Sequence, residues 1–189
     1  MQPMSGHLAQ TLKALRHQRG WSLSQTADQT GVSKAMLGQI EREESSPTVA
    51  TLWKIATGFN VAFSAFLAPS SPSSPPTPTL HRQGALPAFM QENAAMRVTP
   101  LFPFDAQLGF DMFAIELAPG AFSESTPHEP GVIEHVVVLS GELELAIDDR
   151  WHRLAAGEAM RFQADRPHAY RNSSAQAVHI HDLIHYPRT

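Results

Sequence analysis

The sequence predicts a multidomain protein in which an all-α domain is followed by an all-β sandwich or barrel. Up to about residue 67, apolar residues recur at the spacing of one helix face, whereas beyond about residue 110 they alternate as in strands. A segment rich in proline and serine separates the two patterns. We therefore expect a helical domain at residues 1–68, a linker at residues 69–80 and a β domain at residues 81–189.

Five helices are expected before the linker. Leu8, Leu12 and Leu15 place one apolar stripe along the first helix, and Gly20 ends it. The second helix precedes Gly31, which supplies a turn because glycine takes a positive φ without strain. The second to fifth helices are expected to begin at Ser22 or Ser24, at Ser33, at Pro47-Thr48 and around residues 64–67.

The segment between the two patterns is predicted to be a semi-rigid linker. Its five prolines remove backbone donors, so it cannot form a helix or a central strand. Beyond it, short alternating segments separated by glycine, proline or aspartate turns predict a sandwich or barrel. The expected strands are residues 110–117, 132–139, 142–147, 158–162, 168–171 and 177–186.

Charge and cysteine content limit the possible functions. The net charge is −4, but residues 1–68 carry +2 and residues 69–189 carry −6, so the helical domain is the basic part. The absence of cysteine excludes disulfides and thiolate ligands, which leaves histidine and carboxylate for any metal. No apolar run approaches the ~18 residues that span a bilayer, and no signal-peptide core is present. We therefore expect a cytoplasmic protein without a membrane partner.

The second and third helices have the spacing of a helix-turn-helix. Ala27 is small where two helices would cross, Gly31 allows the turn, and Leu37 and Ile40 anchor the following helix. Residues 7–67 resemble the five-helix DNA-binding domain of the phage-repressor (XRE) class of regulators. One position departs from that class: Glu43 stands where glycine is usual after the recognition helix, and a left-handed non-glycine residue costs about 1–2 kcal/mol.

This resemblance implies that the third helix reads double-stranded DNA in the major groove. Glutamine can pair with adenine, lysine can reach guanine or a phosphate, and Ala35 can pack on a thymine methyl group. A homodimer on a two-fold-symmetric operator is expected, because one copy neutralises few phosphates. The alternative is that the helices merely pack, with Lys34 and Arg42 as solvated charges. The DNA-binding residues implied by the resemblance are Gln25, Ser33, Lys34, Ala35, Gln39 and Arg42.

Eight of the ten histidines follow the linker, and two of them have a distinctive spacing. His128 is followed by Glu134 and Gly141, and Gly157 is followed by His168 and Asn172. About residues 96–186 resemble the cupin barrel, a double-stranded β-helix or jelly roll. In that family two histidines and a glutamate of the first motif and one histidine of the second bind a divalent metal.

The resemblance implies that His128, Glu134 and His168 are metal ligands, although Pro130 replaces the remaining histidine of the first motif. Two imidazoles and a carboxylate suit Zn, which we prefer, and are compatible with Fe, Mn or Ni. The alternative is that both histidines only form hydrogen bonds in a polar barrel mouth. The expected lining of the effector pocket is Tyr170, Arg161 and His181, with the last depending on which face of its strand lines the barrel.

Together these patterns predict a transcriptional regulator and not an enzyme. The cupin domain would bind a small-molecule effector, for example an amino acid, and alter DNA binding. One alternative is a cupin metalloenzyme, similar to non-haem dioxygenases, with a DNA-binding head. The other is a barrel that serves only for dimerisation.

Overall fold

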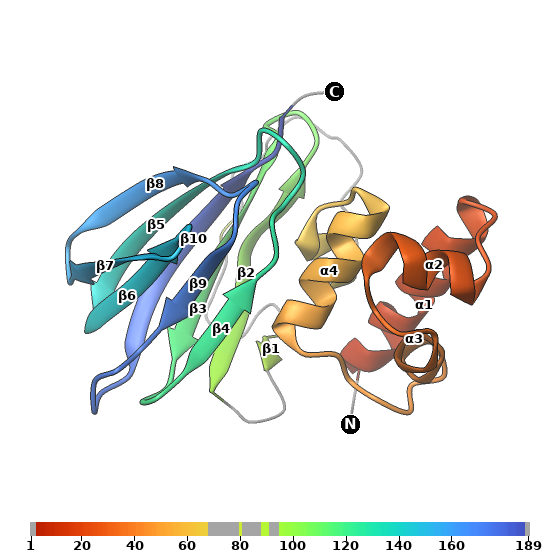
Figure 1. Cartoon of the computed structure of the whole chain (residues 1–189), viewed down its shortest axis with the longest axis horizontal. Helices are drawn as coiled ribbons and strands as arrows, with labels where there is room; N and C mark the ends of the chain where they lie inside the picture. Colours follow the sequence, from red (N-terminus) through yellow and green to blue (C-terminus); the bar gives the residue numbers. More distant parts are fainter. Residues whose placement is uncertain (1–2, 68–79, 81–87, 91–94, 188–189) are drawn as a thin grey trace.

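A computed structural model describes residues 3–67, 80, 88–90 and 95–187, which form a helical domain beside a two-sheet β domain (Figure 1). The expected linker at residues 69–80 lies outside the described residues, apart from Leu80. Among the described helices, none is both long and apolar enough to cross a membrane.

Four α-helices and one 3₁₀ helix make up the described part of the helical domain, so the expected count of five α-helices is corrected to four. The fifth segment is a 3₁₀ helix of four residues, which is the usual length of such helices. The helices are α1 (Pro3–Gln18), α2 (Leu23–Thr30), α3 (Lys34–Glu41), α4 (Val49–Phe59) and the 3₁₀ helix η1 (Phe63–Phe66).

The expected helix boundaries are confirmed by their caps. The hydroxyls of Ser22, Ser33 and Thr48 each accept a hydrogen bond from a backbone amide in the first turn of α2, α3 and α4. Gly31 ends α2 in the left-handed conformation, with a φ of 65°. Glu43 also has a positive φ, of 60°, as its place after α3 predicted.

The helical domain is held by an apolar core and one ion pair. Leu12, Leu37, Leu52 and other residues of the four helices are almost fully buried. The guanidinium of Arg16 donates two hydrogen bonds, of 2.6 and 2.9 Å, to the carboxylate of Glu41 at the end of α3. Since this pair is largely buried, it fixes α1 against the recognition helix.

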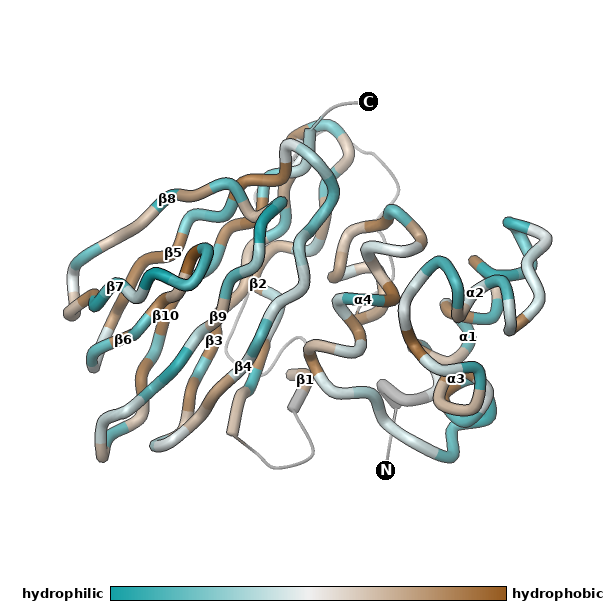
Figure 2. Tube along the Cα trace, in the orientation of Figure 1, coloured by the Kyte–Doolittle hydropathy of each residue, from teal (hydrophilic) through white to brown (hydrophobic). Residues whose placement is uncertain are grey.

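The β domain consists of two antiparallel sheets. One has the strand order β1-β2-β3-β10-β5-β8 and the other β4-β9-β6-β7, and apolar and polar residues alternate along many strands (Figure 2). Four of the ten strands, β1, β2, β4 and β7, were not expected. The bounds are β1 (Phe89–Met90), β2 (Met96–Asp105), β3 (Phe110–Leu117), β4 (Phe122–Ser125), β5 (Ile133–Ser140), β6 (Glu142–Ile147), β7 (Arg150–Ala155), β8 (Ala159–Gln163), β9 (His168–Arg171) and β10 (Val178–His185).

Asn172 and Gly141, which belong to the two sequence motifs, stabilise the barrel. The side-chain amide of Asn172 donates to the carbonyls of Leu117, Ala118 and Gln176, so it ties the end of β3 to the loop before β10. Gly141 joins β5 to β6 with a φ of 82°, and a Cβ there would lie 2.9 Å from the Val178 side chain. Both positions are therefore structural.

The two domains are in contact through η1. The Phe63 ring is fully buried and meets Phe113 of β3 edge to face at 5.6 Å. Beside it, the carboxylate of Asp111 accepts hydrogen bonds of 3.3 Å from the Ser64 amide and 3.4 Å from the Tyr186 hydroxyl. Burial raises the pKa of Asp111 to about 7, so this acid is partly protonated at neutral pH.

Asp111→Asn should change how stability depends on pH. Because the folded chain holds a proton on Asp111 that the unfolded chain has lost, the free energy of unfolding should fall as pH rises from about 4 to about 7. The substitution should remove roughly 2–4 kcal/mol of that fall. Urea unfolding at several pH values would measure it. The exposed Asp149→Asn is the control, and equal slopes in the wild type and Asp111→Asn would contradict the expectation.

Candidate functional site

The six residues expected to face DNA are all exposed on the helical domain. Lys34, Ala35 and Gln39 lie on α3, on the side of this domain that is turned away from the barrel (Figure 1). Three of the six also make local contacts. The Gln25 side chain accepts from the Ser22 amide, Ser33 caps α3, and Arg42 pairs with Glu44 at 2.7 Å.

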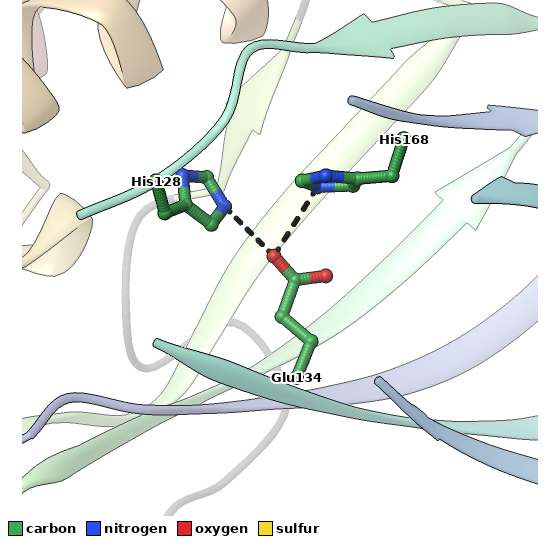
Figure 3. Close-up of side chains that lie close together, drawn as sticks. All are labelled: His128, Glu134 and His168. Carbon is green, nitrogen blue, oxygen red and sulfur yellow. Dashed lines mark hydrogen bonds and ion pairs between the residues drawn. The ribbon is translucent and has the colours of Figure 1, made fainter. Parts of the chain in front are cut away.

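Inside the barrel the structure brings His128, Glu134 and His168 together (Figure 3). Their nearest donor atoms lie within 4.8 Å of one another, and all three side chains are buried. We call these three residues the barrel cluster. His128 precedes β5, Glu134 lies on β5 and His168 on β9, so the cluster spans both sheets.

One carboxylate oxygen is the centre of the barrel cluster. Oε1 of Glu134 lies 2.8 Å from Nε2 of His128 and 3.4 Å from Nε2 of His168. The other oxygen, Oε2, accepts a hydrogen bond from the Tyr170 hydroxyl. Tyr170 is thus next to the cluster, and it orients the carboxylate.

The protonation states follow from burial and charge. Burial raises the pKa of Glu134, but contacts with His128 and His168 outweigh it and hold that pKa well below the usual range. Burial lowers the pKa of His168, and the opposing attraction of Glu134 raises it above its ordinary value. Burial, with the charges of Glu134 and Asp182, raises the pKa of Tyr170, which stays a hydrogen-bond donor.

His168 is oriented as metal-binding histidines usually are. Its Nδ1 lies 2.9 Å from the carbonyl of Arg166 and must donate to it, because a carbonyl can only accept. Whenever the ring is neutral its lone pair is therefore on Nε2, which is buried and lies 3.4 Å from Oε1 of Glu134 without a hydrogen bond. A carbonyl that accepts from Nδ1 in this way fixes the tautomer in which Nε2 is the ligand atom.

Two residues expected in the pocket do not lie there. Arg161 is exposed on β8, whereas its neighbour Phe162 is buried. His181 lies on the same face of β10 as the exposed His179, opposite Asp182. Since side chains alternate along a strand, both point away from the barrel interior. The prediction that Arg161 and His181 line the pocket is therefore wrong.

The expectations missed two residues near the barrel cluster. Asp182 is 3% exposed, and its Oδ1 has no hydrogen-bond partner. Burial and the charges of Glu134 and Asp111 raise its pKa well above the usual range. The alternation of buried and less buried residues along β10 could have predicted that Asp182 points into the barrel. The other is Trp53 of α4, whose ring lies 4.4 Å from that of His128, centroid to centroid.

A helical domain with a helix-turn-helix joined to a barrel with an internal His/Glu/His cluster defines a class of two-domain regulator. A helix-turn-helix family model matches residues 12–66, and a cupin domain model matches residues 113–184. The chain is 57% identical over 190 residues to the HTH-type transcriptional regulator SutR of Escherichia coli (strain K12), with 100% of both chains covered. It therefore belongs to the family of XRE-type helix-turn-helix transcriptional regulators with a cupin domain.

Other relatives agree with this assignment. The HTH-type transcriptional regulator PuuR of Escherichia coli (strain K12) is 27% identical over 170 residues, 89% of each chain. The crystal structure of an HTH_3 family transcriptional regulator from Vibrio cholerae is 39% identical and covers 98% of both chains with a TM-score of 0.80. A match of that extent includes both domains and their arrangement.

Tyr170→Phe should destabilise the protein, because it leaves a buried carboxylate oxygen of Glu134 without its donor. We expect a loss of about 1–3 kcal/mol in the free energy of unfolding. The chain has one other tyrosine, and Tyr186→Phe removes only two hydrogen bonds of 3.4 Å. Because both bonds are at the long limit and the Asp111 oxygen keeps the Ser64 amide as a donor, that control should lose less than Tyr170→Phe. Urea unfolding compares the two, and an equal loss would contradict the assigned role of Tyr170.

Proposed function

We propose that this protein is a cytoplasmic, sequence-specific regulator of transcription whose cupin domain binds a small metabolite through a divalent metal. The observation that supports it best is the buried barrel cluster in a chain whose other domain is a helix-turn-helix. The metal would be held by His128, Glu134 and His168. It would act as a Lewis acid with open positions for a chelating effector such as an amino acid.

The DNA-binding part rests on α3 and its surroundings. Ser33, Lys34, Ala35 and Gln39 lie in its first two turns or at its N-cap and are exposed together. Helices of this type place such residues on base edges in the major groove, while Gln25 and Arg42 flank them. The domain carries only +2, so two copies on a two-fold-symmetric operator are needed for useful affinity.

Gln39→Ala should weaken specific DNA binding. A bidentate contact from glutamine to adenine contributes about 1–3 kcal/mol, so the dissociation constant should rise roughly 5- to 150-fold. The operator would first be obtained by selecting genomic fragments on the purified protein, and affinity would then be measured by fluorescence anisotropy. Gln163→Ala, exposed on β8 of the barrel, is the matched control. Unchanged affinity of Gln39→Ala, or selection of fragments without a common sequence, would contradict the assignment.

The donor set fits a metal. Three donor atoms converge in a buried place, one of them is a carboxylate held ionised, and one is an imidazole nitrogen without a hydrogen-bond partner. Zn suits this set best, and Fe, Mn or Ni are compatible with it. Tyr170 and the carbonyl of Arg166 supply the second shell that orients Glu134 and His168.

His168→Ala should abolish metal binding without unfolding the helical domain. Added Zn should raise the melting temperature of the metal-free wild type, with about 2.7 kcal/mol of stabilisation at 100 times the dissociation constant. In His168→Ala the affinity should fall by more than about 100-fold, since even second-shell losses cost about 10- to 100-fold. His17→Ala, exposed on α1, should behave as the wild type. The site is contradicted if calorimetry and elemental analysis find no Zn, Fe, Mn or Ni in the wild type.

A second function is favoured by the composition of the barrel cluster alone. Two histidines and one carboxylate are also the ligands of non-haem iron oxygenases. A metalloenzyme would take up oxygen in the presence of Fe(II) and a substrate, and a regulator would instead change its DNA affinity when the ligand is added. A barrel used only for dimerisation would do neither, so these two measurements separate the three functions.

A further inference from the structure

The helical domain contacts the barrel cluster directly. The indole ring of Trp53 on α4 lies 4.4 Å from the His128 ring at an interplanar angle of 37°. The same indole also stacks on Phe63, at 4.2 Å and 19°. Phe63 in turn meets Phe113 of β3. Ring contacts thus join α4 directly to the cluster and, through η1, to β3.

A small cleft lies beside the contact between Trp53 and His128. Its volume is about 20 Å³, room for about one water molecule, and both domains line it. Trp53, Asn60 and Val61 come from the helical domain, and Glu129 and Tyr186 come from the barrel. Among the described residues that line it there is no lysine or arginine, so it suits an uncharged or cationic group better than a carboxylate.

A tetrahedral ion would separate His128 from Glu134. Two ligands held at about 2.0–2.2 Å from one ion lie about 3.3–3.6 Å apart in tetrahedral geometry and about 2.8–3.1 Å apart at the right angles of octahedral geometry. The pair formed by His168 and Glu134 already has the tetrahedral separation, at 3.4 Å, but Nε2 of His128 is only 2.8 Å from Glu134. A tetrahedral ion such as Zn would therefore widen this second separation by about 0.5 Å, and the Trp53 ring lies against His128.

Movement of α4 reaches the recognition helix through the core. Leu52 and Ile55 of α4 are fully buried in the same apolar core as Leu37 and Ile40 of α3. Protein interiors are close-packed, so a tilt of α4 is passed on to α2, which packs against both α4 and α3. Trp53 follows Leu52 directly, which gives α4 one side in this core and another on the barrel.

We propose that Trp53 forms one wall of the effector site, so that metal and ligand bound at the barrel cluster act on the recognition helix through α4. This inference rests on the proposed function. It assigns a sensing role to a residue of the DNA-binding domain, whereas the metal ligands all belong to the barrel.

The contact can be tested with a metal ion alone. The chain has three tryptophans, so the full-length double variant Trp21→Phe/Trp151→Phe keeps only Trp53. Addition of Co²⁺, a paramagnetic quencher, should remove most of its fluorescence in a saturable manner. The variant Trp53→Phe/Trp151→Phe keeps Trp21, which packs on Phe59 and not on the barrel, and its emission should change little. His128→Ala in the Trp53-only chain should abolish the quenching.

The transmission can be tested on DNA. In the wild type, Co²⁺ should change the affinity for the selected operator by about 5- to 150-fold. Trp53→Ala should bind Co²⁺ and DNA separately but lose this change, whereas Trp53→Phe keeps an aromatic wall and should retain most of it.

Calorimetry with Co²⁺ separates the possible failures. If the ion binds but Trp53 emission is unaffected, or if Trp53→Ala keeps the full effect on DNA affinity, the sensing role of Trp53 is overturned and the metal site stands. If no ion binds to the wild type, the metal site falls, and the sensing role falls with it.

Discussion

The ionised carboxylate of Glu134 inside the barrel constrains much of the rest of the structure. A buried charge is costly unless it is paired and hydrogen-bonded, and Glu134 meets this need with His128, His168 and Tyr170. These partners come from the loop before β5 and from β9, which belongs to the opposite sheet. The two sheets must therefore pack in one register for the charge to be satisfied, so the same contacts that build the site also fix the barrel.

The barrel interior holds more acids than it can ionise. Asp111 and Asp182 are buried there, and burial together with the charge of Glu134 raises the pKa of Asp182. Neighbouring carboxylates that differ in hydrogen bonding divide into ionised and neutral members. Here the charge is concentrated on the acid that contacts the two imidazoles. The interior thus favours a cation at one place, next to the histidine nitrogens.

Much of the fold could be predicted where local chemistry decides it, as at Gly31 after α2 and in the strand that contains Glu134. Strand β2 could not, because Pro100 and two register shifts against β3 break its alternation. The spacing of the motifs predicted that the three members of the barrel cluster lie close together, and the structure confirms this. Trp53 was missed because its contact joins two domains, and no pattern within one helix reports that packing.

Contact between the domains also bears on how a signal could pass from the barrel to the helical domain. Trp53, Phe63 and Ser64 lie directly on the barrel. One aromatic contact contributes about 0.5–1.5 kcal/mol and one hydrogen bond about as much. Coupling between allosteric sites is typically about 1–3 kcal/mol. The loss or gain of two or three such contacts is therefore sufficient, and no separation of the domains is needed for the barrel to influence α3.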